Sequence, residues 1–396
     1  MSTGVPPLGE HSGSGSTPSI RAPRFLLLAG EASGDLHGAR VAHALRERFP
    51  DCALVGTGGE AMARAGVERF AELEDLAVMG FVEVLWRLPY FLRLERDVRS
   101  RLRSGTVDLL IAIDYPGFNL RAVEAAHEAG IPSIAYIAPQ VWAWKKGRAA
   151  RLSRAADRIA VILPFEEEIF RKAGGNAHFV GHPLLDRRDD VPTRDAFCSE
   201  AGLDPDHPIL AVFPGSREQE IGRHLKPFFR AAQLLTEEIP ELQVGIALAS
   251  DRRLELPRGS TFRQVRDGRA LLHHARAGIV KSGTSTLEAA LEGLPFVVAY
   301  RTHPTTFWLA QRLVQVDHVA LANLVAGERV VPELLQGEVT PSKLAAAVRP
   351  LLEGGEERER ILEGLRRVRG ALGSPGAARR VARLAEEVLR ESGDSA

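Results

Sequence analysis

Short apolar runs alternate with longer amphipathic stretches along most of this chain. The short runs have the length of buried strands, and the stretches between most of them have the period of helices. Strands that alternate with helices predict parallel sheets with both faces covered. The predicted strands are Phe25–Ala29, Ala53–Val55, Leu109–Ile113, Ser133–Ile137, Ile159–Ile162 and His178–Val180 in a first series, and Ile209–Phe213, Val244–Leu248, Gly278–Val280 and Pro295–Ala299 in a second.

Three regions interrupt the alternation and predict how the chain divides. Residues 1–22 are rich in Gly, Ser and Pro and predict a disordered leader, whereas residues 186–208 are polar and proline-containing and predict a linker. From residue 340 onward the pattern is helical without a strand. We therefore expect an α/β fold of two doubly wound, Rossmann-like domains that face a cleft, with the ligand at the carboxyl ends of the strands. The two domains are expected at residues 23–185 and 209–339, and a helical tail at residues 340–396.

Composition narrows the class of protein. Hydrophobic residues make up 45% and charged residues 26% of the 396, as in soluble globular proteins. The 51 basic side chains balance 51 acidic ones, which argues against a nucleic-acid partner. Cys52 and Cys198 lie far apart, without the spacing of a disulfide framework or a zinc site. Because no apolar run approaches the roughly 20 residues of a membrane span, and the leader lacks the apolar core of a signal peptide, we expect a cytoplasmic location.

Two small-residue turns in the second half predict a nucleotide-sugar site. Pro214-Gly215-Ser216-Arg217 and Ser282-Gly283-Thr284 each follow a predicted strand and open an amphipathic helix. The unpaired N–H groups at a helix N-terminus can hold a diphosphate. Arg217 adds a cationic fork, and Glu288, one helical turn further on, can hold a ribose diol. Either turn alone is explained equally well as an ordinary capped turn, but the two together favour the site.

Two acidic residues are candidates for a general base. Asp114 closes the predicted strand Leu109–Ile113, and Glu31 occupies the equivalent end of the first strand. A carboxylate at the carboxyl end of a buried parallel strand points into the cleft, where partial desolvation raises its pKa toward that of a useful base. The alternative for Asp114 is a turn-capping role, because Asp before Pro-Gly often bonds its own backbone.

Two stretches place aromatic side chains near cations. Residues 78–93 are unusually apolar and are followed by several arginines, which suits a membrane interface or a lipid groove but also a buried core helix. Residues 138–148 include Trp142 and three cations, which suits a sugar ring, an anionic head group or a packed edge. The apolar side chains that we assign to the lipid surface are Met79, Phe81, Val82, Leu85 and Trp86.

These motifs, in this order, resemble the lipid-A-disaccharide synthase family. The resemblance spans about Phe25 to Leu352. The leader lies outside it and the last helix matches only loosely, so no functional residue is carried over to either. The stretches that carry it are Ala29–Asp35, Leu76–Leu85, Ile113–Asn119, Pro139–Trp144, Leu163–Glu166, Phe179–Pro183, Pro214–Arg217, Ser282–Glu288 and Ala322–Gly327.

The resemblance implies an inverting glycosyltransferase of the GT-B type that uses neither a metal nor a cofactor. Its donor would be UDP-2,3-diacylglucosamine and its acceptor 2,3-diacylglucosamine 1-phosphate, and it would release a β-1,6 disaccharide 1-phosphate and UDP. Asp114 would take the proton from the acceptor 6-hydroxyl, with Glu31 as its rival. The residues that would hold the UDP are Gly215, Ser216, Arg217, Ser282, Gly283, Thr284 and Glu288.

Four further residues fall in family motifs and become candidate substrate-binding residues: Ser33, Asn119, Trp142 and Asn323. The apolar surface would receive acyl chains or rest on the cytoplasmic face of the inner membrane, making the enzyme a peripheral membrane protein. Family members can also dimerise by exchanging C-terminal domains, which the helical tail permits. Two alternatives stay open. A related UDP-N-acetylglucosamine transferase or epimerase would have no reason for the apolar surface, and a non-catalytic UDP-sugar-binding module would have no need of Asp114.

Overall fold

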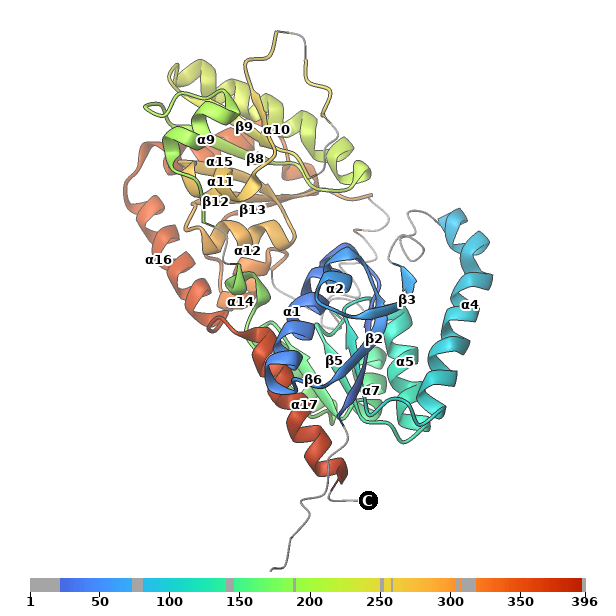
Figure 1. Ribbon diagram of the computed structural model, residues 1–396. Helices are drawn as coiled ribbons and strands as arrows, with labels where there is room; N and C mark the ends of the chain where they lie inside the picture. Colours follow the sequence, from blue (N-terminus) through green and yellow to red (C-terminus); the bar gives the residue numbers. More distant parts are fainter. Residues whose placement is uncertain are drawn as a thin grey trace, which may run out of the picture.

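The computed structural model describes residues 22–72, 81–139, 146–187, 190–249, 253–257, 259–303, 307 and 318–393, with the backbone alone described for residues 81–88 and 146. The described chain forms two lobes, each built on one parallel sheet (Figure 1). Within these residues no helix has both the length and the apolar character needed to cross a membrane.

The first sheet has seven strands in the order β3-β2-β1-β4-β5-β6-β7, and every neighbouring pair is parallel. Alternate residues of its central strands enter two different apolar cores, one under α1 and α17 and the other under α4, α5 and α7. The strands are β1 Arg24–Ala29, β2 Ala53–Gly58, β3 Glu68–Glu72, β4 Leu109–Ile113, β5 Ser133–Tyr136, β6 Arg158–Val161 and β7 Ala177–Phe179. The helices are α1 Ala32–Arg48, α2 Glu60–Arg64, α4 Phe81–Arg103, α5 Pro116–Glu128, α7 Lys146–Ala155, α8 Pro164–Lys172 and α17 Ala377–Gly393.

The second sheet has six parallel strands in the order β10-β9-β8-β11-β12-β13 and a single large apolar core. Its strands are β8 Ile209–Phe213, β9 Gln243–Ala247, β10 Arg263–Val265, β11 Ala277–Lys281, β12 Phe296–Tyr300 and β13 Glu333–Leu335. Its helices are α9 Arg194–Ala201, α10 Glu218–Glu238, α11 Gly268–His274, α12 Thr284–Leu291, α14 Leu321–Ala326, α15 Pro341–Glu353 and α16 Glu356–Ala371, with short 3₁₀ turns at Pro183–Asp186 and Gln336–Glu338.

The chain passes between the two lobes twice. It leaves the first lobe at the 3₁₀ turn Pro183–Asp186 and returns between α16 and α17, so that α17 packs against α1 (Figure 1). The two passages lie side by side, because the His182 N–H donates to the Leu372 carbonyl at 3.0 Å. Alanine, valine and leucine side chains of α17 are buried in the first core. The last helix of the chain therefore belongs structurally to the first lobe.

Both sheets contain a topological switch point, at which the strand order reverses. The reversal lies between β1 and β4 in the first sheet and between β8 and β11 in the second. In doubly wound sheets the ligand binds at the carboxyl ends of the strands beside this point. Glu31 and Asp114 follow β1 and β4, and the turns at Pro214–Arg217 and Ser282–Thr284 follow β8 and β11. The chain order thus brings every predicted reactive group to a switch point.

The structure confirms the expected fold of two doubly wound sheets with a helical tail. The central strands lie within one to three residues of their predicted ends. Three edge strands, β3, β10 and β13, are missing from the prediction because they are short and are not apolar along their length. Helix α9 forms inside the predicted linker and buries Phe197 and Cys198 in the second core. The proposed domain boundaries stay predictions.

Candidate active site

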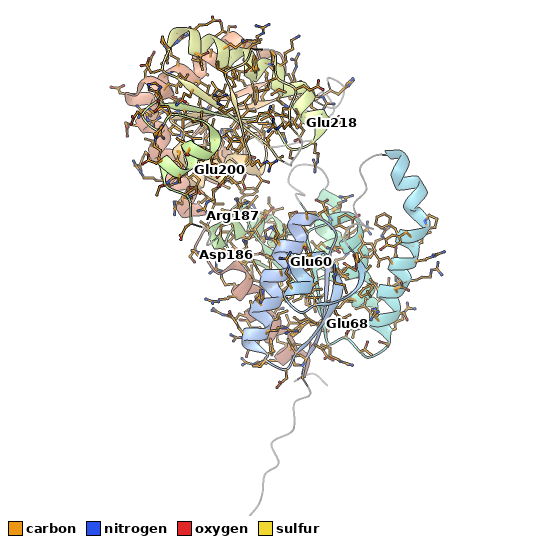
Figure 2. The ribbon with its side chains drawn as sticks, turned by 45° about the horizontal axis from the view of Figure 1, so that its top comes forward. Glu60, Glu68, Asp186, Arg187, Glu200 and Glu218 are labelled. Carbon is orange, nitrogen blue, oxygen red and sulfur yellow. The ribbon has the colours of Figure 1, made fainter. Side chains whose placement is uncertain are left out.

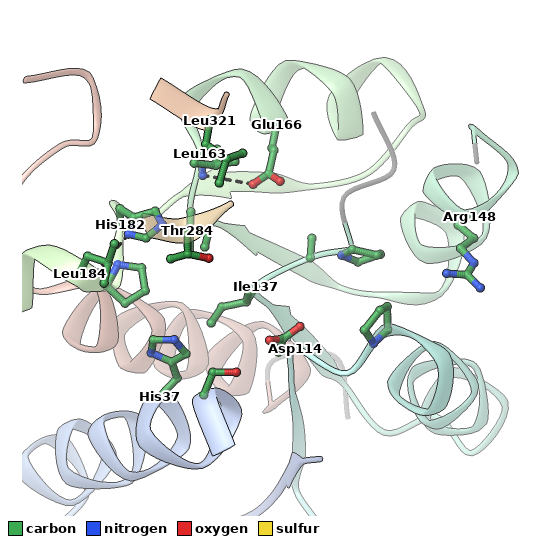
Figure 3. Close-up of a pocket in the computed structure, with 16 residues that line it drawn as sticks. His37, Asp114, Ile137, Arg148, Leu163, Glu166, His182, Leu184, Thr284 and Leu321 are labelled. Atoms are coloured by element: carbon green, nitrogen blue, oxygen red, sulfur yellow. Dashed lines mark hydrogen bonds between the residues drawn. The ribbon is translucent and has the colours of Figure 1, made fainter. Parts of the chain in front are cut away.

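A cavity of about 600 Å³ lies between the two lobes, at the carboxyl ends of their strands. Ser33, His37 and Asp114 line it from the first lobe, and Thr284 and Leu321 line it from the second. Figure 3 shows Asp114, His37 and Thr284 facing this common space. A volume of this size is typical of small-molecule sites, which commonly lie between domains. The cavity therefore brings groups from both predicted domains to one candidate site.

The backbone on the first-lobe side of the cavity is held in an uncommon conformation. Asp114 and Tyr115 both have φ of 51°, and Ile137 has φ of 61°. Asp tolerates this left-handed region, but a β-branched residue such as Ile rarely adopts it. Asp114 and Ile137 both line the cavity, and backbone strain of this kind clusters at functional sites.

The Asp114 carboxyl is only partly exposed, and its surroundings disfavour ionisation. Burial, and then the negative charge of Glu31, raise its pKa, while a hydrogen bond from the Tyr115 N–H (2.9 Å) opposes the shift. That bond is the backbone contact expected of a turn-capping aspartate, so Asp114 caps the turn and also faces the cavity. Glu31 is exposed at the N-cap of α1 and makes no side-chain capping bond. Of the two candidate bases, Asp114 has the more suitable environment.

Asn119 and Ser33 occupy different positions relative to this cavity. The buried Asn119 amide donates to the carbonyls of Ile113 (3.1 Å) and Leu28 (3.3 Å), which ties the ends of β4 and β1 together. Ser33 is exposed and lines the cavity. For Ser33, direct contact with the substrate stays a prediction. Asn119 can influence the site indirectly, because it fixes the end of the strand that precedes Asp114.

Two histidines line the cavity that sequence reasoning did not select. Burial, helped by the positive charges of Arg40 and Arg187, lowers the pKa of His37 to about 4. Burial and the neighbouring His37 lower the pKa of His182 to about 4 as well. Both rings are therefore neutral at physiological pH. The Nδ1 atom of His182 accepts from the Leu184 N–H at 3.2 Å, whereas the buried Nδ1 of His37 has no partner within the described residues.

The first predicted diphosphate turn is closed by a side chain of its own helix. Glu220 accepts from the N–H groups of Ser216 (3.2 Å) and Arg217 (3.4 Å), which completes a capping box. Gly215 has φ of 121°, and a Cβ there would lie 2.8 Å from the Glu220 side chain. The Arg217 side chain is 78% exposed and lies 3.9 Å from Glu220. Two of the N–H groups predicted to meet a diphosphate are therefore already satisfied.

The second predicted turn is open. Gly283, with φ of 151°, is the N-cap of α12 and has no side chain of its own to cap that helix. The Ser282 hydroxyl donates to the Val319 carbonyl at 2.8 Å, which fastens the turn to the chain before α14. Thr284, the first residue of α12, lines the cavity. The positive end of α12 thus points toward the space shared by the two lobes.

The predicted ribose residue Glu288 forms an ion pair that the sequence does not reveal. Its Oε1 atom accepts from Arg187 Nη2 at 2.8 Å, although 101 residues separate the two. Arg187 follows the 3₁₀ turn that connects the lobes, and Figure 2 shows it between them. This contact joins the interlobe passage to the second switch point.

Asn323 is fully buried in α14, and hydrogen bonds hold its side-chain amide in place. Its amide oxygen accepts from the N–H groups of Val330 and Val331, both at 2.9 Å. Its amide nitrogen donates to Glu333 Oε1 at 2.8 Å. These bonds hold the chain between α14 and β13 and engage both ends of the amide. The contact of Asn323 with substrate stays a prediction.

Several predicted residues lie outside the described part of the chain. Met79 and Trp142 are among them, and so are the side chains of Phe81, Val82, Leu85 and Trp86, although the backbone of the last four forms the start of α4. Further along α4, Arg99 pairs with Glu128 at 2.9 Å and Arg101 lies over the Phe70 ring at 4.2 Å. These two arginines are therefore engaged within the first lobe.

Comparison with known proteins gives the same family that the motifs resemble. A family model described as lipid-A-disaccharide synthetase matches residues 25–387. A lipid-A-disaccharide synthase of Myxococcus xanthus is 42% identical over 374 residues, which cover 93% of this chain and 98% of that protein. A second, from Trichlorobacter lovleyi, is 41% identical over 382 residues, covering 94% and 99%.

Solved structures share the fold at low sequence identity. The glycotransferase of kitacinnamycin matches with a TM-score of 0.63 and 19% identity, over 93% of this chain and 100% of that one. The calicheamicin glycosyltransferase CalG4 matches at 0.60 and 18%, over 94% and 99%. A putative UDP-N-acetylglucosamine 2-epimerase from Listeria monocytogenes matches at 0.63 and 12%, over 91% and 95%. Since glycosyltransferases and an epimerase match alike, this likeness identifies the GT-B fold and does not separate the activities.

Proposed function

The chain belongs to the lipid-A-disaccharide synthase family, and from this premise we propose how its cavity joins two acylated glucosamines. It is a glycosyltransferase that uses a UDP-sugar donor and a sugar-phosphate acceptor. We assign UDP-2,3-diacylglucosamine as the donor and 2,3-diacylglucosamine 1-phosphate as the acceptor. The products are the β-1,6 disaccharide 1-phosphate and UDP. The observation that supports this assignment is one cavity lined by Asp114 from the first switch point and Thr284 from the second.

In the proposed reaction Asp114 acts as the general base. Its carboxylate accepts the proton of the acceptor 6-hydroxyl as that oxygen attacks the anomeric carbon of the donor. The bond between the anomeric carbon and the diphosphate oxygen breaks, and its electron pair leaves with UDP. One displacement inverts the configuration, so a single base is sufficient. The raised pKa of Asp114 supports this role, because a stronger base shares the proton more fully in the transition state.

The donor is held by the second switch point. In this arrangement the N-terminus of α12 faces the diphosphate, the exposed Arg217 adds a positive charge, and Glu288 accepts hydrogen bonds from the ribose hydroxyls. Gly283 offers no side chain to cap α12, which supports this arrangement, because the N–H groups of Thr284 and Ser285 can then meet an anion. Charge that develops on the leaving group is then met by the helix end and by cationic side chains.

We propose that the start of α4 is the surface for acyl chains or for the inner leaflet. The apolar sequence from Met79 to Trp86 supports this role. A triple variant with serine at Val82, Leu85 and Trp86 should lose sedimentation with anionic vesicles and keep its melting temperature. A collapsed melting temperature would instead identify a core helix, where each large apolar truncation costs about 2–5 kcal/mol.

A homodimer is the proposed assembly. The passage between α16 and α17 is the segment through which C-terminal parts can be exchanged, because α17 packs on the opposite lobe from α16. Analytical ultracentrifugation would give twice the monomer mass if the proposal holds.

The reaction itself is tested by incubating the purified protein with both acylated glucosamine substrates and analysing the products by mass spectrometry. The disaccharide 1-phosphate should form together with UDP. An epimerase would change the donor without an acceptor, and a binding module would leave both substrates unchanged, so either result would refute the assignment.

A further inference from the structure

Lys281 is a largely buried lysine whose position is not explained by any role assigned above. It is the last residue of β11, the strand that pairs with β8 at the second switch point. Its side chain is 16% exposed. Lysine is rarely buried unless its charge is paired, because removing an ammonium group from water is costly. The burial of a lysine at the carboxyl end of a central strand therefore needs an explanation.

The Lys281 ammonium lies between the two turns of the donor site. Its Nζ atom donates to Glu220 Oε1 at 2.8 Å, while Glu220 Oε2 accepts from the backbone of the Pro214–Arg217 turn. On the other side, a Cβ at Gly283 would lie 3.4 Å from the same Nζ. One side chain thus bonds the carboxylate that closes the first turn and fills the space next to Gly283 in the turn that stays open.

The pairing of Lys281 with Glu220 fixes the position of the ammonium group. Burial alone would raise the pKa of Glu220, but the hydrogen bond and charge of Lys281, with the two backbone N–H groups, lower it, so the carboxylate is ionised at neutral pH. An ammonium group has three N–H donors. The bond to Glu220 uses one of them, and the group lies next to the uncapped N-terminus of α12. Arg217, in contrast, is 78% exposed.

We propose that Lys281 is a further donor-binding residue, whose ammonium group hydrogen-bonds the diphosphate of the UDP-linked donor beside the open turn Ser282–Thr284. The inference rests on the proposed function and adds to it a fixed cation held by Glu220. During transfer the diphosphate oxygen gains the electron pair of the broken bond, and Lys281 stabilises that charge while keeping its own proton. Such a preorganised donor needs no rearrangement when the charge develops.

The inference is tested by calorimetry of UDP and of uridine with Lys281→Met. UDP affinity should fall about 10- to 100-fold, the effect of losing a hydrogen bond to a charged group. Uridine affinity should stay within twofold, because uridine lacks the diphosphate. Lys343→Met is the matched control: Lys343 belongs to the same lobe, is 56% exposed and pairs with Glu338 at 3.5 Å. It should change neither affinity.

A purely structural Lys281 gives different results. The single variant would then lower the melting temperature and weaken UDP and uridine alike, or leave both unchanged, and either result would overturn the inference. If the single variant does not fold, the double variant Lys281→Met/Glu220→Gln is used in its place, because it leaves no unpaired carboxylate at this position. UDP affinity within twofold of wild type in that double variant would also refute the role.

The outcome is separable from that of the proposed function. If wild type forms no disaccharide but binds UDP in a Lys281-dependent way, the reaction is wrong and the cation site stands. If wild type forms the disaccharide and Lys281→Met keeps both its UDP affinity and its turnover, the reaction stands and Lys281 is not part of it.

Discussion

The two switch points have the same strand geometry and opposite chemistry. In the first sheet, β1 and β4 are followed by the acids Glu31 and Asp114. In the second sheet, β8 is followed by the turn with Arg217, and β11 ends in Lys281. At the first, the negative charge of Glu31 adds to burial in raising the pKa of Asp114. At the second, cationic side chains are paired with Glu220 and Glu288 beside the N-terminus of α12. Asp114 and Thr284 line one cavity. The proposed reaction therefore has its base on one side of the substrates and its anion site on the other.

The two switch points also differ in the interactions that hold their residues in place. At the first, left-handed backbone at Asp114 and Ile137 and the buried amide of Asn119 fix the strand ends. At the second, Glu220 closes one turn and orients Lys281 beside the other. In the proposed reaction, the first switch point carries the chemistry and the second binds the donor. The following variants test that division, from the largest expected effect to the smallest.

Replacing Asp114 by Asn should separate chemistry from binding. Turnover should fall by roughly 10²- to 10⁴-fold, the usual contribution of a general base, while UDP affinity stays near the wild-type value. Asn also tolerates the left-handed φ at this position, so the backbone is preserved. The melting temperature should rise slightly, because the variant no longer buries an ionised carboxylate whose folded-state pKa is raised. Turnover within a few-fold of wild type would remove Asp114 from the mechanism.

Replacing Arg217 by Ala should weaken UDP binding about tenfold, near the lower end for a hydrogen bond to a charged group. The exposed side chain loses more freedom on binding than a fixed cation does, so the effect should be smaller than that of Lys281→Met. Calorimetry at two salt concentrations measures it, and the loss should shrink at high salt. A larger loss for Arg217→Ala than for Lys281→Met would reverse the order proposed here.

Replacing Arg187 by Ala should have the smallest effect, a two- to fivefold loss of UDP affinity, since partly exposed ion pairs contribute about 0–1 kcal/mol. The loss is expected because Arg187 orients Glu288 from the interlobe passage. In a Glu288→Gln background the same change should have no further effect, and inorganic diphosphate should bind normally in both. Equal losses for UDP and diphosphate would place Arg187 at the diphosphate instead.

The sequence predicts the centre of each sheet better than its edges and its side-chain pairings. Leu109–Ile113 and Ile209–Phe213 match their strands residue for residue, because both are buried along most of their length and uniformly apolar. The edge strands β3, β10 and β13 are short and partly exposed, so no such pattern marks them. At the site, Asp114 could be predicted as a cavity residue because it directly follows an apolar strand.

The pairings could not be found in this way. Lys281 is adjacent to the predicted turn in sequence, but the position of its ammonium group depends on an ion pair with Glu220, which lies 61 residues away. Arg187 pairs with Glu288 across 101 residues of chain, and His37 of α1 is close enough to His182 to lower its pKa. Such contacts follow from the tertiary fold, which brings distant segments of the chain together and which local sequence patterns do not encode.

The most direct test of the division is the pH dependence of a single turnover, compared between wild type and Glu31→Gln. A general base must be deprotonated, so the rate falls as the pH drops through its pKa, and the raised pKa of Asp114 places this fall above the pH of an ordinary aspartate. Glu31 contributes to that shift through its negative charge. Glu31→Gln should therefore stay active and move the fall to lower pH. Loss of activity in Glu31→Gln, or a fall that does not move, would contradict the assignment of Asp114 as the base beside a charged Glu31.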